Sequence, residues 1–229
     1  MCGRFVLAMP FDLLAEWLEA NFDEQIGLDY RPRWNIAPTS RILAMRSYDG
    51  ERRIEEYRWG LIPNWSKDIP KFSTHNARVE TISTKPTFRH AFASGQRVLI
   101  PADGYYEWQV LGEPSKPVKQ PWYMTSKDQL HLAFAGIYEP WSAHGPGGVK
   151  INTCSVITTT PGPDIGEIHD RQPVVLSRDT WDTWLDPETS VDETRALLSP
   201  AEIGTFDLRK VGSAVGNSRS EGEQLIEPL

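Results

Sequence analysis

The second residue of the chain offers the most unusual chemistry in the sequence. Cys2 follows Met1 in the opening MCGRF, and a small residue in this place normally permits removal of the initiator methionine. Removal would leave Cys2 with an α-amine beside its thiol. Their reference pKa values of about 7.7–8.0 and about 8.5 make reactive forms of both available near neutral pH. The amine can form an imine with an aldehyde, and the thiolate can then close a thiazolidine ring. Position alone favours the alternative of an ordinary buried cysteine.

Two other side chains are candidates for proton transfer. His169 lies in EIHDRQPVVL, between a turn and an expected strand, and an imidazole exchanges protons near pH 6.5. Glu107 lies in PADGYYEW, where aromatic neighbours would desolvate the carboxyl group and raise its pKa toward values useful in acid–base catalysis. The alternatives are a surface histidine with ion-paired neighbours and a strand glutamate that points into water.

Two further motifs have residue types suited to nucleic acid. Asn76 and Arg78 are two apart in STHNARVET, so an extended backbone would turn both toward one groove. The planar guanidinium of Arg78 suits a phosphate, although an ion pair with Glu80 is the default alternative. Trp59 and Trp65 belong to WGLIPNW, which could stack on bases or simply supply a core residue and a turn.

The sequence gives little support for a metal or a bound cofactor. Its histidines show no ligand spacing, and there is no Cys-x-x-Cys pair; the five are His75, His90, His131, His144 and His169. A phosphate-binding glycine-rich loop is also missing from the sequence. We therefore expect no metal and no cofactor, and we assign Cys154 to a buried strand without a functional role.

Composition limits the classes of protein to which the chain can belong. The 229 residues are 39% hydrophobic and 10% aromatic, which suits a packed core. A net charge of −7 argues against coating nucleic acid through bulk electrostatics and confines any DNA binding to a local site. Two cysteines, no signal peptide and no apolar run long enough for a bilayer indicate a soluble cytoplasmic protein without membrane contact.

Local patterns predict the elements that must position these residues. Phe11 to Phe22 has the apolar spacing of an amphipathic helix, and Arg31 to Ser40, with two prolines, predicts an ordered loop. Residues 41–48 and 52–59 predict a hairpin around Asp49-Gly50. Further strands are expected at Arg97–Pro101, Tyr105–Val110, Pro121–Thr125, His131–Tyr138, Ile151–Thr158 and Pro173–Leu176.

The remaining segments complete one α+β domain. Helices are expected at Arg178–Trp184 and at Val191–Leu198, the second with Ser190 and Glu193 at capping-box spacing. The Gly/Pro-rich stretch Ser142–Gly148 predicts a surface loop between strands. Most strands are too close in sequence for helical crossovers, which favours antiparallel pairing. We expect a single compact β-rich domain over residues 1–229.

Taken together, the motifs resemble the SRAP family (SOS-response-associated peptidases, also called abasic-site processing proteins). The matching blocks are MCGRF at the start, WNIAP at 34–38, WGLIPNW at 59–65, NARVET at 76–81, ADGYYEW at 102–108, IHDRQP at 168–173 and AVGN at 214–217. They run in order along nearly the whole chain. The resemblance implies a mostly antiparallel, barrel-like core flanked by helices.

The resemblance also implies a reaction and a set of residues. The reaction is covalent capture of abasic sites in single-stranded DNA by a monomer, in the DNA damage response and at the nucleoid. Cys2 would be the nucleophile, Asn76 and Glu107 would line the reacting sugar, and His169 would handle protons. The expected DNA contacts are Arg4, Arg78 and Arg171 to phosphates, with Asn35, Pro38, Trp65 and Trp108 shaping the path of the strand. Weak strand cleavage by β-elimination and reversal of the adduct are expected side reactions.

Two other functions fit the same residues. In an N-terminal-nucleophile hydrolase, Cys2 would attack an amide with its own amine as base. Such an enzyme would cleave peptides and ignore abasic DNA. In a non-catalytic single-strand binder, arginine and tryptophan alone would act, and intact and abasic oligonucleotides would bind equally well.

Overall fold

Strands make up most of the regular structure. The structure of this chain is a computed structural model that describes residues 2–127, 131–143 and 148–229; Met1 and residues 144–147 of the expected loop lie outside the described residues. The strands are β1 (Phe5–Leu7), β2 (Asn21–Phe22), β3 (Arg33–Ile36), β4 (Arg41–Tyr48), β5 (Glu51–Trp59), β6 (Asn76–Arg78), β7 (Arg97–Ala102), β8 (Gly104–Leu111), β9 (Val118–Ser126), β10 (Leu132–Ser142), β11 (Lys150–Thr159), β12 (Gln172–Pro173) and β13 (Phe206–Lys210). The helices are α1 (Phe11–Leu18), α2 (Glu24–Asp29), α3 (Arg89–Ala93), α4 (Trp181–Leu185) and α5 (Val191–Ala196), with 3₁₀ turns η1 (Arg178–Thr180), η2 (Ser213–Gly216) and η3 (Glu223–Ile226).

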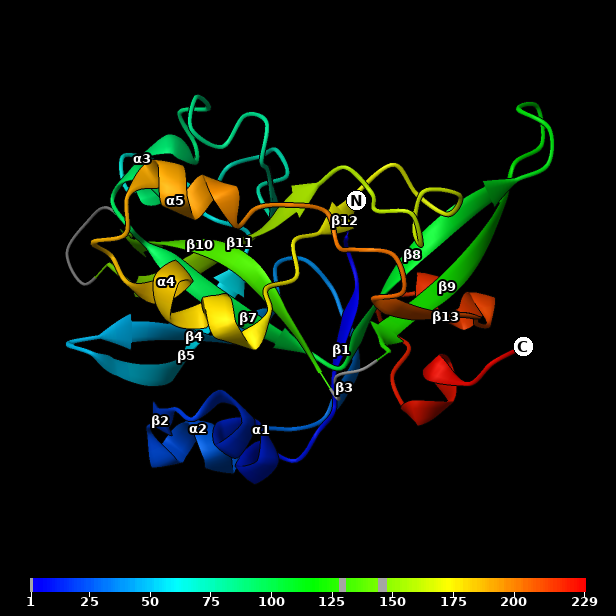
Figure 1. Cartoon of the computed structure of the whole chain (residues 1–229). Helices are drawn as coiled ribbons and strands as arrows, with labels where there is room; N and C mark the ends of the chain where they lie inside the picture. Colours follow the sequence, from blue (N-terminus) through cyan, green and yellow to red (C-terminus); the bar gives the residue numbers. More distant parts are fainter. Residues whose placement is uncertain (1, 128–130, 144–147) are drawn as a thin grey trace.

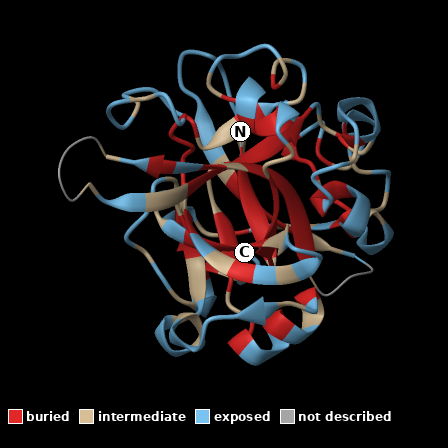
Figure 2. Ribbon diagram, turned by 90° about the vertical axis from the view of Figure 1, so that its left-hand side faces the viewer, coloured by how far each residue is buried: buried red, intermediate tan, exposed pale blue. Residues whose placement is uncertain are grey.

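Five of these strands form a closed ring. The order β11–β10–β7–β4–β5 is antiparallel throughout, and β5 closes the ring by pairing in parallel with β11. β7 is buried at every position because the ring covers one of its faces and α4 packs on the other. Figure 2 shows the buried residues gathered on the central strands and the exposed ones on the surrounding loops and helices. The expected barrel-like, mostly antiparallel core flanked by helices is confirmed.

A second sheet has the order β13–β9–β8–β1–β3. Its short strand β1 is buried at all three positions and lies between β8 and β3, with Phe5 paired to both Tyr105 and Ile36. β8 and β9 form a long hairpin that extends outward from the rest of the molecule (Figure 1). The sheet thus holds the chain's N-terminal segment between strands that come from distant parts of the sequence.

The hairpin at residues 41–59 forms as the sequence predicts. β4 and β5 pair from Arg41↔Arg58 to Tyr48↔Glu51, and the turn residues Asp49 and Gly50 have φ values of 50° and 80°. Two consecutive positive φ values are what a tight two-residue turn requires, and Asp-Gly adopts them at low cost.

The N-terminal helix is shorter than its apolar pattern predicts. The expected helix over Phe11 to Phe22 ends at Leu18, because Glu19 takes a left-handed conformation with φ 50° that cannot continue the helix. Asn21 and Phe22 form β2 instead, parallel to β5. The chain reversal returns Phe22 edge-on to Phe11, with 4.7 Å between the ring centroids.

The expected loop from Arg31 to Ser40 is also wrong in part, because it contains β3. Pro32 precedes this strand and Pro38 follows it, so neither proline removes a hydrogen bond from the pairing of Ile36 with Phe5. The preference for antiparallel pairing likewise has exceptions, since β11 pairs in parallel with β5 and β6. Tertiary partners decide both features, and local sequence does not encode them.

The helices after residue 177 follow the predicted pattern closely. The expected helix at Arg178–Trp184 appears as η1 followed by α4, and the expected helix at Val191–Leu198 appears as α5. Ser190 and Glu193 form the reciprocal capping box, in which each side chain accepts from the other residue's backbone N–H.

Candidate active site

The pairing of β1 with β8 brings the N-terminus to the carboxylate predicted from sequence. Phe5 lies opposite Tyr105, and the backbone N–H of Tyr106 donates to the carbonyl of Arg4 at 3.0 Å. Side chains alternate along a strand, so Tyr105 and Glu107 share one face of β8. Tyr106 faces the other way, where its hydroxyl donates to the carbonyl of Trp34 at 2.9 Å.

Cys2 is buried completely and is held through its backbone. Its side chain belongs to the main hydrophobic core, and its carbonyl accepts a hydrogen bond of 2.7 Å from Nδ2 of Asn76. Burial, with a contribution from the charge of Glu107, raises the pKa of the Cys2 thiol, and a hydrogen bond from the backbone N–H of Arg4 to the sulfur opposes this rise. The resting state of the sulfur at neutral pH is therefore the thiol.

Asn76 reaches Cys2 because β6 extends the barrel on the side of β11. The pairing is parallel, with Asn76 opposite Val156, so the side chains of Asn76 and Arg78 lie on the face of β6 opposite to that of the buried Ala77. The amide of Asn76 gives one proton to Cys2, while its buried Oδ1 has no hydrogen-bond partner among the described residues. A buried acceptor left without a donor is costly in a resting protein, so Oδ1 of Asn76 is available to accept a hydrogen bond from a ligand.

His169 faces Glu107 from the segment between β11 and β12. The distance from His169 Nε2 to Glu107 Oε2 is 3.6 Å, longer than a hydrogen bond. The backbone N–H of Arg171 donates to His169 Nδ1 at 3.0 Å, so the proton of the neutral ring is assigned to Nε2, on the side of Glu107. Oδ1 of the exposed Asp170 lies 3.0 Å from Nδ1 and can accept from it once the ring is protonated.

Burial changes the protonation of this pair in a useful direction. It raises the pKa of Glu107 to about 7, so that this carboxyl exists in both protonation states near neutral pH. It lowers the pKa of His169, which favours the uncharged ring. One group that both gives and takes protons therefore stands beside a neutral imidazole.

Glu107 and His169 open into a cleft of about 720 Å³. The lining residues come from the residue before β1, from the β8–β9 hairpin, from the segment before β12 and from η2; they are Arg4, Glu107, Trp108, Gln109, Val110, Lys119, Gly166, Glu167, Ile168, His169, Asp170 and Gly216. Of the predicted residues, Arg4, Glu107, Trp108 and His169 thus share one cavity. Cys2 and Asn76 do not line it, and Cys2 lies wholly beneath the surface.

Arg171, a predicted phosphate contact, is engaged inside the protein. It is 7% exposed and forms a two-pronged ion pair with Glu80, with N–O distances of 2.6 and 3.0 Å. Its guanidinium also donates to the carbonyl of Thr158 at 2.6 Å. These bonds join the segment at 168–173 to the segment after β6, and they orient the backbone N–H that fixes the tautomer of His169.

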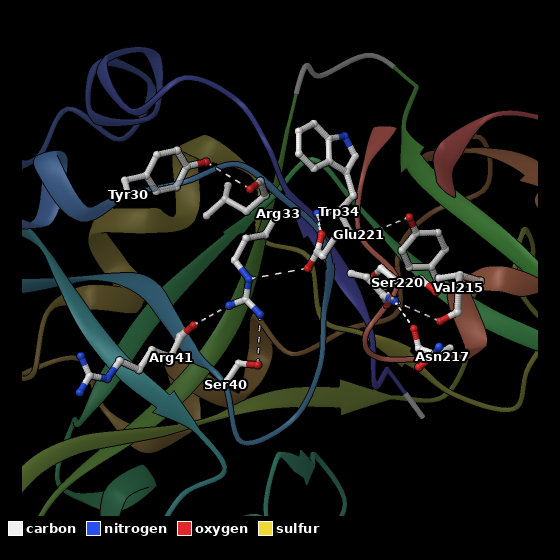
Figure 3. A network of polar contacts seen from close by, with 12 residues as sticks. Tyr30, Arg33, Trp34, Ser40, Arg41, Val215, Asn217, Ser220 and Glu221 are labelled. Carbon is white, nitrogen blue, oxygen red and sulfur yellow. Dashed lines mark hydrogen bonds and ion pairs between the residues drawn. The ribbon is translucent and has the colours of Figure 1, made fainter. Parts of the chain in front are cut away.

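Asn35, predicted to shape the DNA path, likewise binds another part of the chain. Its Nδ2 donates to the carbonyls of Val215, Asn217 and Ser220 at 2.9–3.3 Å. Figure 3 shows these carbonyls beside the contact of the Trp34 backbone with Glu221. Asn35 therefore holds η2, which lines the cleft, and affects the cleft through that segment.

The other predicted DNA contacts lie nearer the surface. Trp65 is 61% exposed, as a stacking residue must be, whereas Trp59 of the same motif is fully buried in the core. Arg78 is exposed at the end of β6, and Pro38 is partly buried after β3. None of these three side chains lines the cleft that contains Glu107, so their contacts with DNA stay predictions.

One residue of this region has no counterpart among the predicted site residues. Tyr105 is fully buried in the same core as Cys2, and its hydroxyl has no hydrogen-bond partner among the described residues. Burial raises the pKa of Tyr105, and a negative charge on Cys2 or Glu107 raises it further. The alternation of β8 contains a hint, because Tyr105 and Glu107 are two apart. The pairing of β8 with β1, which brings the segment of Cys2 to this strand, cannot be predicted from the local sequence pattern.

The described part of the chain has neither a metal-binding cluster nor a membrane-spanning helix. No group of three or more His, Cys, Asp or Glu side chains there is arranged to hold a metal ion. No helix there has both the length and the apolar character needed to cross a bilayer.

Comparisons with known proteins cover nearly the whole chain. The model of the family described as SOS response associated peptidase (SRAP) matches residues 1–218. The abasic site processing protein YoaM of Bacillus subtilis is 38% identical over 229 residues, which cover 99% of this chain and 98% of the relative. The abasic site processing protein YedK of Escherichia coli is 28% identical and covers 100% of both chains. A crystal structure of a protein from Bacteroides thetaiotaomicron covers 100% of both chains with a TM-score of 0.84 at 25% identity.

Proposed function

The chain belongs to the SOS response associated peptidase (SRAP) family, and from this premise we propose that it captures abasic sites in single-stranded DNA covalently through Cys2. Relatives that match nearly the full chain are named abasic site processing proteins, which supports abasic-site processing in general. The reacting groups are the α-amine and the thiol of Cys2 once Met1 has been removed. The substrate is the open-chain aldehyde of the abasic deoxyribose.

One observation carries the proposal. A cysteine that becomes a 1,2-aminothiol after trimming lies beside a carboxyl group with a pKa of about 7, which in turn faces a neutral imidazole in an open cleft. These are the groups that imine formation and ring closure need. Their convergence from the N-terminus, β8 and the segment before β12 supports this chemistry over a purely structural role for Cys2.

The first step is opening of the sugar. An abasic deoxyribose is mostly a closed hemiacetal, and opening it requires a proton to leave the 1-hydroxyl and another to reach the ring oxygen. His169 acts as the acid–base group for this exchange from its place in the cleft. Its proton is on Nε2 because Nδ1 is occupied by the N–H of Arg171.

The second step joins amine and aldehyde. The amine attacks C1′ to give a carbinolamine, and loss of water then gives the imine. Glu107 moves protons in both stages, since its raised pKa lets it act as acid and as base at the same pH. Asn76 holds the sugar through its buried Oδ1, which can accept a hydrogen bond from a sugar hydroxyl.

Ring closure completes the adduct. The sulfur of Cys2 adds to the imine carbon and forms the thiazolidine, and holding all groups in one site replaces a bimolecular encounter with an intramolecular one. The same imine permits β-elimination, so weak strand cleavage accompanies capture. Arg4 and Trp108 at the cleft, with Arg78 and Trp65 outside it, guide the strand of a DNA bound by one monomer.

A denaturing gel tests the proposal. Correctly trimmed protein and an oligonucleotide with one abasic site should give a species that survives denaturation, and an intact oligonucleotide should give none. Cys2→Ala should abolish the stable species, while borohydride should still trap an imine with its amine. A stable adduct of normal yield from Cys2→Ala would overturn the proposal.

The same preparation distinguishes the hydrolase alternative from covalent capture of DNA. An N-terminal-nucleophile peptidase would cleave peptides in a Cys2-dependent way and leave the abasic oligonucleotide unattached. Mass spectrometry of the N-terminus is the necessary control, because retained Met1 blocks the amine in either case.

A further inference from the structure

Tyr105 carries a buried polar group that the proposed reaction does not yet use. The residue is 0% exposed, and its hydroxyl has no hydrogen-bond partner among the described residues. The ring is fixed by edge-on contacts with Phe134 and Phe206, at centroid distances of 5.9 and 5.8 Å. A hydroxyl without a partner destabilises a folded protein, whereas phenylalanine would fill the same space without that cost. The presence of a tyrosine hydroxyl at position 105 therefore indicates a functional role for this group.

The neighbours of Tyr105 are the reacting groups. It lies two residues before Glu107 on the same face of β8 and opposite Phe5 of β1, three residues after Cys2. Cys2 and Tyr105 belong to one packed core, and a negative charge on Cys2 or Glu107, whenever either group is ionised, acts on the Tyr105 hydroxyl. Burial raises the pKa of Tyr105 well above its ordinary value, so the hydroxyl keeps its proton near neutral pH. It is therefore available as a hydrogen-bond donor and does not transfer the proton.

The charged form of the Cys2 sulfur is poorly stabilised by its surroundings. Burial and the carboxylate of Glu107 both oppose a thiolate at this place. One donor is present, the backbone N–H of Arg4. A buried anion normally needs several hydrogen bonds in place of its lost hydration, so a second donor is required during ring closure.

We propose that the Tyr105 hydroxyl is the second hydrogen-bond donor to the Cys2 sulfur and stabilises the thiolate that closes the thiazolidine ring. This inference rests on the proposed function and adds a residue to its last step. In that step the thiol proton passes to Glu107, and the thiolate forms the S–C1′ bond. The electron pair of the C=N bond moves to nitrogen, which receives the proton. No co-reactant is needed, and Tyr105 keeps its own proton throughout.

Tyr105→Phe tests the proposal, and Tyr106→Phe is its matched control. Phenylalanine keeps the contacts with Phe134 and Phe206, so the fold is retained. The control removes a neighbouring hydroxyl that donates to Trp34 on the opposite face of β8. Tyr105→Phe should slow formation of the stable adduct about tenfold, the effect of losing one hydrogen bond to a charged group. Tyr106→Phe should leave the rate within twofold of wild type.

The pH profile gives an independent readout of the sulfur. Loss of a donor to the thiolate raises the pKa of the thiol, so the rise of the ring-closure rate with pH should move about one pH unit higher in Tyr105→Phe. It should not move in Tyr106→Phe. An unchanged rate and an unchanged profile in Tyr105→Phe would overturn the inference.

A background without sulfur separates this inference from the proposed function. In Cys2→Ala only the imine can form, and borohydride trapping measures it. Adding Tyr105→Phe to Cys2→Ala should leave the rate of trapping unchanged, because no sulfur remains for the hydroxyl to assist. Slower trapping in the double variant would contradict action through sulfur. Absence of any adduct from wild-type protein would instead refute the proposed function itself.

Discussion

Two buried glutamates, each facing a histidine, lie in different parts of the molecule. Glu107 on β8 faces His169 across 3.6 Å at the cleft, and Glu139 on β10 faces His90 of α3 across 2.7 Å. Both glutamate side chains are 2% exposed, and burial raises the pKa of both. The residue types and the burial of the glutamates therefore do not distinguish the two pairs.

The geometry does distinguish them. His90 and Glu139 form a direct hydrogen bond, and Glu139 also receives the backbone N–H of Asn64, so this pair anchors the loop that carries Trp65. His169 and Glu107 are held too far apart to bond, and both open into a cavity. A short, hydrogen-bonded pair stabilises a loop, whereas the spaced pair lines a cleft in which a substrate can reach both the acid and the base.

Replacing each glutamate should separate the pairs most sharply. Glu107→Gln cannot transfer protons, and we expect the single-turnover rate of adduct formation with saturating abasic DNA to fall by about 100-fold or more. Glu139→Gln keeps a shape that can still bond to His90, and its rate should stay within about twofold of wild type. Comparable losses in the two variants would mean that both pairs are structural.

Replacing the histidines should give the next largest effect. His169→Ala removes the group assigned to ring opening, so adduct formation should slow by about tenfold to 100-fold. Added imidazole should restore part of the rate, because the vacated space opens into the cleft. His90→Ala is the matched control. It should alter thermal stability slightly and show no response to imidazole, and an imidazole response there would break the comparison.

The last expected effect concerns the dependence of stability on pH. The pKa of Glu107 is about 7 in the folded protein against a reference value of 4.5, so the folded state binds the proton more tightly. Its contribution to stability is complete below about pH 4.5 and is lost as pH rises through 7. Glu107→Gln should remove this loss and raise the free energy of unfolding at pH 8 by up to about 3 kcal/mol. Denaturant unfolding at pH 5 and pH 8 measures the difference, and equal stabilities of wild type and variant at pH 8 would contradict it.

Local patterns in the sequence account for most of the barrel. The Asp49-Gly50 turn and the capping box of Ser190 depend only on neighbouring residues, and both form as expected. β3 was missed because its partner Phe5 lies far away in sequence. The expected helix is longer than α1 because the left-handed residue that ends the helix is Glu19, and no glycine in the sequence marks this position.

The sequence predicts some residues of the candidate site better than others. The types of Glu107 and His169 suggested their chemistry, and the structure places both in one cleft. Arg171 and Asn35 were expected to meet DNA, yet Glu80 and backbone carbonyls occupy them. Sequence shows that an arginine can bind an anion, but only the tertiary structure shows which anion is near. Tyr105 is not among the predicted site residues for the same reason, because only the tertiary structure brings the N-terminal segment to its strand.

The pairing of β1 also sets an order of events during synthesis. Phe5 pairs with Tyr105, about 100 residues later in the chain. At about 5–20 residues per second, the ribosome delivers that partner strand roughly 5–20 seconds after the N-terminus. The nascent N-terminus therefore stays open to an aminopeptidase for that interval, before folding encloses Cys2 in the core. Trimming ahead of enclosure would free the α-amine of Cys2 while the N-terminus is still accessible to processing.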